Sequence, residues 1–316
     1  MKTFLALLLL IPSLGWGELV TEWTNWGKTE NHDSSVRNEW SQIIDKNFSR
    51  LGDYSHKFEL RANECYYDDC PRGDHEGAYG RVEAYLNNPT NNNYLGEEGE
   101  NWYLWSIYID GSDINDLKDN HFAQFAQFKL SYSIDVLAKK WPHCEYLGEV
   151  VFILQYKAGT DGLGLSREFC KEDYLYEHPA SKHILVNKDE LLNQWLDFIV
   201  HAKWGEEGFL KMYINGDLKY LAEGFISNEF RVPSKKNKFA GPSFRYGVYV
   251  GRVPKNFDGN IVAWYSNIAR AKNCDDQKFS KILSNLGYSC ESLEDIDGIY
   301  AKPKININPD AHPEFD

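Results

Sequence analysis

The sequence predicts an all-β protein, a jelly-roll sandwich of two antiparallel sheets with a few short helices. Three observations support this. Apolar residues recur with a period of two, as in strands with one buried face. Turn signals such as Asp110-Gly111 and Asn215-Gly216 separate the short runs. Aromatic residues, which favour strands, make up 15% of the 316 residues. We find no internal repeat and no linker, so one domain is expected.

The first two strands are expected at residues 56–63 (HKFELRAN) and 80–86 (GRVEAYL). In each run apolar and polar side chains alternate, so one face is buried and the other is polar. The polar faces carry Arg61, Arg81 and Glu83. Antiparallel sheets usually turn one polar face to water, so solvation alone could explain these charges.

The next two strands are expected at residues 102–109 (WYLWSIYI) and 122–130 (FAQFAQFKL). Strict alternation would give the second of these two distinct faces. Phe125, Gln127 and Lys129 would lie on one face, and Gln124, Ala126 and Phe128 on the other.

The second half of the chain continues the same pattern. Residues 209–221 read as a hairpin that turns at Asn215-Gly216. A short helix is expected to begin at residue 188, and an amphipathic helix at 275–287 should end at Gly287. The other strands are expected at residues 149–157, 196–204 (with His201 on its polar side), 243–252 and 260–271.

The strand at 243–252 (SFRYGVYVGR) places Arg245, Gly247 and Tyr249 on one face. It lies in the most cationic stretch of the chain, since residues 229–255 hold seven Lys and Arg against one Glu. Such a patch can attract an anionic ligand even though the net charge of the chain is −13. A solvated run of charges is the alternative interpretation.

The N-terminal residues 1–17 (MKTFLALLLLIPSLGWG) are typical of a secretory signal peptide. One domain is then expected over residues 18–290, and a C-terminal tail over 291–316. No later run approaches the roughly 18 apolar residues of a membrane span. We therefore expect a protein secreted to the medium or the periplasm, with no membrane partner.

The acidic net charge of −13 argues against nucleic acid as a partner, and a monomer is expected. Six cysteines after a signal peptide suggest disulfides. Six cysteines allow 15 pairing schemes. A zinc site is the alternative, although no CxxC pair accompanies them. Proximity in the sequence favours the pairs Cys65–Cys70, Cys144–Cys170 and Cys274–Cys290.

Several motifs occur in an order that resembles a known family. They are the Arg-x-Glu at 81–83, the Gln-containing strand at 122–130, the His-x-Lys-Trp at 201–204 and the Arg-x-Gly-x-Tyr at 245–249. Over roughly residues 55–276 the chain resembles secreted polysaccharide lyases of the heparin lyase I-like and glucuronan lyase-like group. Alginate lyases of the same fold show a parallel pattern. The resemblance implies a concanavalin A-like β-jelly roll.

The resemblance also implies β-elimination on an anionic, uronic-acid-containing polysaccharide. Tyr249 would be the base, the acid or both. Arg245 and Gln127 would neutralise the C5 carboxylate of the uronate. Arg245 stands where Lys is commoner, which keeps a cation. Lys129 stands where many relatives have His, and it would act as a cation or as the base.

Four further residues are candidates for substrate contact: Arg61, Arg81, His201 and Glu83. Glu83 could instead orient Arg81. The resemblance implies no cofactor. A structural Ca²⁺ is conceivable because acidic residues cluster in one loop, but they lack the spacing of a calcium-binding loop. These acids are Asp68, Asp69 and Asp74.

Two other functions stay open. A non-catalytic, lectin-like module would share the fold, but it would not need Tyr, Arg and Gln to converge. A glycoside hydrolase would need two carboxylates about 5 to 10 Å apart. The nearest acid-x-acid pattern, EDIDG at 294–298, lies outside the expected sandwich. The sequence leaves open which uronate polymer is cut, and whether cleavage is internal or terminal.

Overall fold

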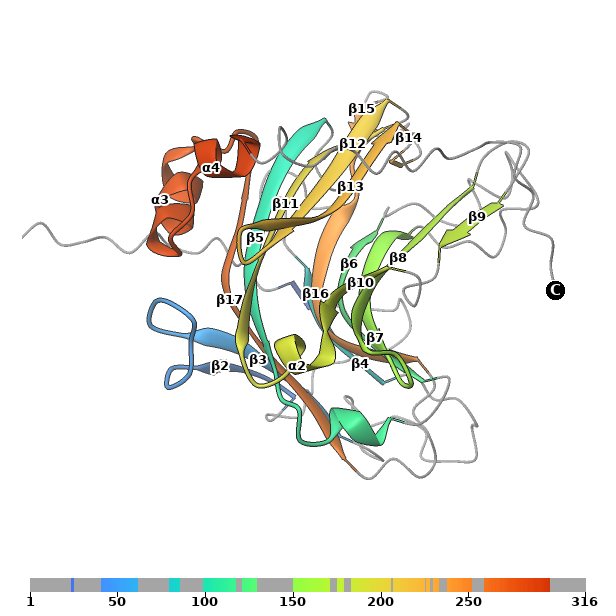
Figure 1. Ribbon diagram of the computed structural model, residues 1–316, viewed down its shortest axis with the longest axis vertical. Coiled ribbons are helices and arrows are strands. Elements are labelled where there is room, and N and C mark those ends of the chain that lie inside the picture. The colour runs from blue at the N-terminus through green and yellow to red at the C-terminus, as the bar shows by residue number, and fades with distance from the viewer. Residues whose placement is uncertain are drawn as a thin grey trace, which may run out of the picture.

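The computed structural model confirms the predicted sandwich of two antiparallel sheets (Figure 1). The two sheets pack face to face, and a few short helices lie outside them. The structure describes residues 24–25, 41–61, 80–85, 99–117, 121–129, 150–170, 175–178, 183–205, 207–224, 226–227, 230–232, 238–251 and 259–295. The expected signal peptide at 1–17 lies outside these residues.

The first sheet has the strand order β1-β4-β16-β6-β7-β8-β10, and β9 pairs with β8. Strand β16 is therefore central, between β4 and β6. The bounds are β1 (Thr24–Asn25), β4 (Gly80–Tyr85), β6 (Phe122–Lys129), β7 (Val150–Lys157), β8 (Gly162–Cys170), β9 (Leu175–His178), β10 (Ile184–Asn187) and β16 (Ser243–Gly251).

The second sheet has the order β13-β12-β11-β5-β17-β3-β2. Its bounds are β2 (Gln42–Asp45), β3 (Ser55–Arg61), β5 (Glu100–Ile109), β11 (Trp195–Lys203), β12 (Gly208–Ile214), β13 (Asp217–Gly224) and β17 (Asn260–Ala271). Outside the two sheets lie the hairpin of β14 (Phe230–Val232) and β15 (Lys238–Ala240), the 3₁₀ turn η1 (Ile114–Asp116) and helix α2 (Lys188–Leu191).

The main core lies between the two sheets and is rich in aromatic rings. Trp105 of the second sheet stacks on Phe198 with ring centroids 5.2 Å apart. It also reaches across to Phe244 of β16, with centroids 4.6 Å apart. Full burial of one such side chain contributes about 1.5 to 3 kcal/mol. These aromatic rings therefore account for a large part of the packing between the two sheets.

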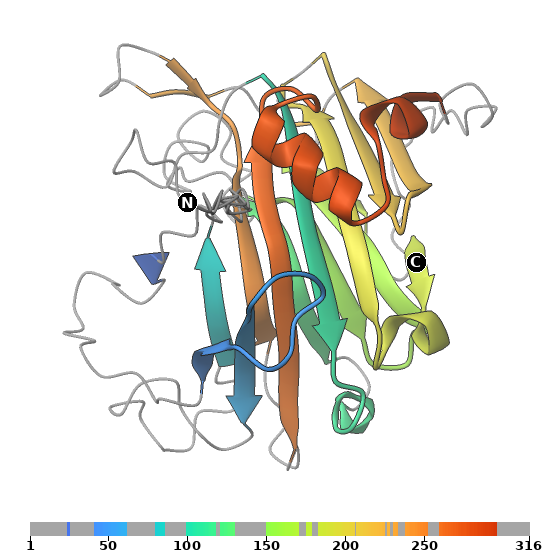
Figure 2. The same ribbon diagram turned by 90° about the vertical axis from the view of Figure 1, so that its left-hand side faces the viewer.

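A second apolar layer covers the outer face of the second sheet. Helices α3 (Gln277–Asn285) and α4 (Cys290–Asp295) lie over this face (Figure 2). Phe279 of α3 packs in one cluster with Trp102 and Ile199. The side chain of Asp276 accepts hydrogen bonds from the first-turn N–H groups of α3. Gly287 follows the helix with φ 94°, so the predicted amphipathic helix and its glycine stop are both confirmed.

A disulfide joins Cys274 to Cys290 across the α3 segment, which confirms one predicted pair. The other two pairs involve cysteines outside the described residues, apart from Cys170 at the end of β8. Helix α4 runs through Asp295, so the first part of the expected tail is helical. Among the described residues, no helix is long and apolar enough to cross a membrane.

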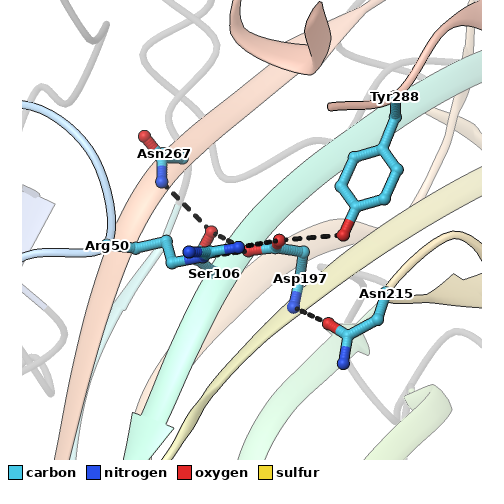
Figure 3. A network of polar contacts seen from close by, with 6 residues as sticks. All are labelled: Arg50, Ser106, Asp197, Asn215, Asn267 and Tyr288. Carbon is cyan, nitrogen blue, oxygen red and sulfur yellow. Dashed lines mark hydrogen bonds and ion pairs between the residues drawn. The ribbon is translucent and has the colours of Figure 1, made fainter. Parts of the chain in front are cut away.

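On the outer face of the second sheet, a buried carboxylate joins several segments of the chain through hydrogen bonds and an ion pair. Asp197 is 1% exposed and accepts hydrogen bonds from the hydroxyls of Ser106 and Tyr288, at 2.7 and 3.0 Å. Arg50 Nη2 lies 3.2 Å from it and compensates the buried charge. Figure 3 shows the whole network: Arg50, Ser106, Asp197, Asn215, Asn267 and Tyr288.

The predicted hairpin turn is also confirmed. Asn215 and Gly216 have φ of 52° and 87°, the left-handed conformations that a tight hairpin turn requires. Asn215 Oδ1 accepts a hydrogen bond from the Asp197 N–H at 2.9 Å. The turn is thereby joined to the same network.

Candidate functional site

Strand β16 carries Arg245 and Tyr249 on the face of the first sheet that points away from the core. Their neighbours Phe244, Tyr246, Val248 and Val250 all point into the core. The backbone register pairs Arg245 with Gln127 of β6 and Tyr249 with Arg81 of β4. The structure therefore brings together several residues that the sequence singled out. We call this outer surface of β4, β16 and β6 the site face.

A direct contact crosses the site face. Gln127 Nε2 donates a hydrogen bond to Glu83 Oε1 at 2.6 Å. Glu83 lies on β4 and Gln127 on β6, so this bond passes over β16, which separates the two strands. Adjacent strands are about 4.8 Å apart, so only long side chains can meet across an intervening strand.

Gly247 lies directly beneath this contact. It pairs in register with Glu83, and its φ is 136°, a conformation that side-chain-bearing residues rarely adopt. Its neighbours Tyr246 and Val248 point into the core, so a side chain at this position would project toward the site face. The bare glycine between Arg245 and Tyr249 thus has a structural reason in addition to the room it leaves for a ligand.

The alternation predicted for residues 122–130 is wrong, because β6 contains a bulge. Phe125 and Ala126 are adjacent, yet both lie in the core. In the ladder with β7, Gln124 pairs with Gln155 and Ala126 with Leu154, so Phe125 is an extra residue. The bulge shifts the alternation by one residue from that point on.

As a result, Gln124 and Gln127 share the site face although they are three residues apart. Gln124 lies opposite Tyr249 in the register and is 7% exposed. The alternation of the sequence placed Gln124 on the other face, so it was not predicted as a site residue. The adjacent apolar pair Phe125-Ala126 between the two glutamines was the available signal of a bulge.

The site face has a buried floor and a more accessible end. Arg245, Gln127 and Glu83 are 2%, 3% and 4% exposed. Arg245 is diagonal to Glu83 across the β16–β4 pair, a position from which opposite charges attract. Tyr249 is half-buried and meets the ring of Phe122 edge-on, with centroids 6.2 Å apart. It lies four residues, about 13 Å, from Arg245 along β16.

Lys129 lies at the far end of β6, opposite Ser243. It is five residues from Gln124, the partner of Tyr249, which is about 16 Å along the strand. The structure does not bring Lys129 beside Tyr249. Lys129 is half-buried at that end of the strand.

Arg61 and His201 belong to the second sheet, so the structure does not bring them to the site face. Arg61 Nε donates to Glu59 Oε1 at 2.6 Å. His201 stacks on Trp102 with centroids 3.8 Å apart, and its Nε2 lies 2.7 Å from Glu100 Oε1. Alternation along these two strands indicated the correct polar face, but it could not show which sheet a strand joins.

The remaining candidates cannot be placed in the same way. Arg81 is in register with Tyr249, but the structure does not describe its side chain. Asp68, Asp69 and Asp74, the conceivable calcium ligands, lie outside the described residues. Within the described part of the chain, no group of three His, Cys, Asp or Glu residues could hold a metal ion.

Comparison with known proteins defines the class of this protein. A family model described as polysaccharide lyase matches residues 19–269, and the chain belongs to that family. It is thus a polysaccharide lyase, as the order of its motifs indicated. A search of curated proteins found no match.

Solved structures with similar folds include an endo-β-1,4-glucuronan lyase from the fungus Trichoderma reesei. The TM-score is 0.50 at 13% sequence identity, over 80% of this chain and 95% of the other. An alginate lyase from Pseudomonas aeruginosa is similar with a TM-score of 0.43 at 14% identity, over 69% of this chain and 83% of the other. At these identities, the glucuronan lyase match supports the jelly-roll fold alone.

Proposed function

We propose that this polysaccharide lyase cleaves a uronic-acid-containing polysaccharide by β-elimination on the site face, with Tyr249 as the proton-transferring residue. The observation that supports this most is the convergence of Tyr249, Arg245 and the Gln127–Glu83 pair on one face of three adjacent strands. A sugar-binding surface without catalysis would not need this combination.

The reaction sets three tasks. The carboxylate at C5 of the uronate must be neutralised, so that the proton on C5 becomes acidic. A base must remove that proton, and an acid must protonate the glycosidic oxygen as the C4–O bond breaks and a C4–C5 double bond forms. Donors fixed in advance toward the developing charge lower the barrier of such a reaction.

Tyr249 performs the second and third tasks in this proposal. Its phenolate takes the C5 proton, and the resulting phenol returns a proton to the leaving oxygen. A cation beside a phenol stabilises the ionised form. Arg81 is the cation opposite Tyr249 in the register, and Arg245 follows on the same face of β16. Gln124, also opposite Tyr249, can donate a hydrogen bond to the sugar or to the phenol oxygen.

Gln127 and Arg245 neutralise the uronate carboxylate. The Glu83 carboxylate accepts a hydrogen bond from Gln127 Nε2, so the Gln127 amide is held with its nitrogen, and not its oxygen, toward Glu83. One Nε2 hydrogen serves that bond, and the second hydrogen can be directed at the substrate. Lys129 is then a contact for a more distant part of the polymer, because it lies about 16 Å along the strand from Gln124.

The polymer is an anionic polysaccharide outside the cytosol. Membership of the polysaccharide lyase family and the similarity in fold to an endo-β-1,4-glucuronan lyase support a uronate as the substrate class. The N-terminal signal-like segment and the Cys274–Cys290 disulfide support secretion or export to the periplasm.

The test is to mix the purified protein with glucuronan, alginate, heparin-like and other uronate polymers. The C4–C5 double bond of the product absorbs in the ultraviolet, and mass spectrometry identifies the unsaturated sugar. We expect one polymer to yield such products. Binding to a polymer with no unsaturated product would replace this proposal with the carbohydrate-binding function, and hydrolysed products would indicate a glycoside hydrolase.

A further inference from the structure

One residue of the second sheet reaches through the core to the strands of the site. Tyr265 lies on β17 and is fully buried. Its hydroxyl lies 2.6 Å from the carbonyl oxygen of Phe125 and 2.7 Å from that of Gly247. These carbonyls belong to β6 and β16, the two strands that carry Gln124, Gln127, Arg245 and Tyr249.

These two carbonyls lie where the ladder between β6 and β16 is interrupted. Tyr246 pairs with Ala126 and Tyr249 with Gln124, so the ladder leaves out Phe125 on one strand and Gly247 and Val248 on the other. A carbonyl that loses its ladder partner inside a protein needs another donor. Tyr265 supplies that donor from the opposite sheet.

The single hydroxyl proton is shared between two acceptors at nearly equal distances. Burial raises the pKa of Tyr265 well above its usual range, so the hydroxyl keeps its proton at any working pH. The two hydrogen bonds of this hydroxyl therefore hold the interrupted part of β6 next to the interrupted part of β16. The interruption in β6 determines which of its side chains reach the site face, whereas the alternation along β16 continues unchanged.

We infer that Tyr265 is a positioning residue for the lyase reaction. By holding the carbonyls of Phe125 and Gly247, it fixes the offset of β6 against β16, which places Gln124 opposite Tyr249 and Gln127 over Gly247 beside Glu83. It touches no substrate. This inference rests on the proposed function, because the aligned residues are those assigned to β-elimination.

The experiment compares Tyr265→Phe with Tyr103→Phe. Tyr103 is a buried tyrosine of the same core, but its hydroxyl accepts a hydrogen bond from Trp204 Nε1 at 3.3 Å. Each variant removes one buried hydroxyl and leaves the ring in place. Three quantities are measured: kcat and KM on the cleaved polymer, the denaturant midpoint, and hydrogen exchange of residues 122–129 and 243–251.

We expect Tyr265→Phe to lower kcat by about 10- to 100-fold, as small misplacements of catalytic groups do, with KM changed less than about threefold. Exchange in both strands should be faster than in Tyr103→Phe, even where the two denaturant midpoints agree. Equal kcat and equal exchange in the two variants would overturn the inference.

The wild-type protein separates this inference from the proposed function. If the wild-type protein yields no unsaturated product from any polymer, the proposed function fails. The role of Tyr265 is then decided by hydrogen exchange of residues 122–129 and 243–251 alone. Faster exchange confined to the two strands would then still support the positioning role. Unchanged exchange would refute it.

Discussion

Gln127 Nε2 donates to Glu83 Oε1 at 2.6 Å across the strand that separates them. The bond joins β4 to β6 over β16, so one side-chain interaction links three strands of the first sheet. It is buried, where the loss of a hydrogen bond is costly. Arg245 and Tyr249 lie on either side of it, so the pair forms the floor between them.

Glu83→Ala should destabilise the protein and reduce its activity. The substitution leaves the buried Gln127 donor without its acceptor, which costs about 1 to 3 kcal/mol in the free energy of unfolding. Glu83→Gln keeps an acceptor but lets the Gln127 amide turn over, so stability should fall less while kcat still falls. Denaturant unfolding and kcat of both variants check this. An equal loss of stability in Glu83→Ala and Glu83→Gln would contradict the proposal that Glu83 orients the Gln127 amide.

Gly247→Ala should reduce activity by obstructing the site face. The matched control is Gly224→Ala, because Gly224 also has a positive φ, 95°, but an added Cβ would meet nothing within 4 Å. Both changes place alanine at a positive φ that side-chain-bearing residues rarely adopt, which costs on the order of 1 to 3 kcal/mol. Only Gly247→Ala should also lower kcat. Full activity of that variant would show that the glycine serves the backbone alone.

Stability should fall between pH 7 and pH 5 because of His56. This residue is buried beside the Tyr246 hydroxyl, and burial lowers its pKa to about 3. The unfolded chain takes up a proton near pH 6.5 while the folded chain does not, so acidification favours unfolding. The contribution of His56 to this loss is about 2 kcal/mol between pH 7 and 5.

His56→Gln removes the titrating ring and keeps an acceptor for Tyr246. Denaturant unfolding gives the free energy of unfolding at pH 7 and at pH 5. The difference between the two values should be about 2 kcal/mol smaller in this variant than in wild type. An unchanged pH effect would mean that His56 does not resist protonation in the folded protein.

Cys274→Ser with Cys290→Ser should destabilise the protein without removing its activity. The disulfide closes a loop with a sequence separation of 16, and a loop of that size is worth about 3 kcal/mol. It lies with α3 and α4 on the outer face of the second sheet, so the site face should keep its geometry. Denaturant midpoints and kcat test both parts. A large loss of kcat at temperatures where the variant is folded would contradict this separation.

Much of the fold could be predicted because burial alone sets the period of each strand. The alternation along residues 56–63 placed Phe58 and Leu60 in the core, where the structure has them. Asn215-Gly216 marked a turn because both residues tolerate a positive φ. The pairing of strands distant in sequence was beyond this method, since periodicity is a local property.

The site was predicted less completely, for two physical reasons. Membership of a sheet depends on long-range pairing, so Arg61 and His201 were grouped with residues from which the structure separates them. The bulge at Phe125 inserts one residue and reverses the faces beyond it. A period of two cannot anticipate that insertion, which is why Gln124 was assigned to the wrong face.

Proton transfer by Tyr249 is tested most directly by the rate at which Tyr249→Phe forms unsaturated product from the polymer that wild type cleaves. Tyr108→Phe, a change at a half-buried tyrosine of the second sheet, is the control. We expect Tyr249→Phe to remain folded, to bind the polymer, and to lose about 100-fold or more of kcat, because it cannot transfer a proton. Tyr108→Phe should keep wild-type kcat. Wild-type kcat in Tyr249→Phe would contradict the assignment of proton transfer to Tyr249.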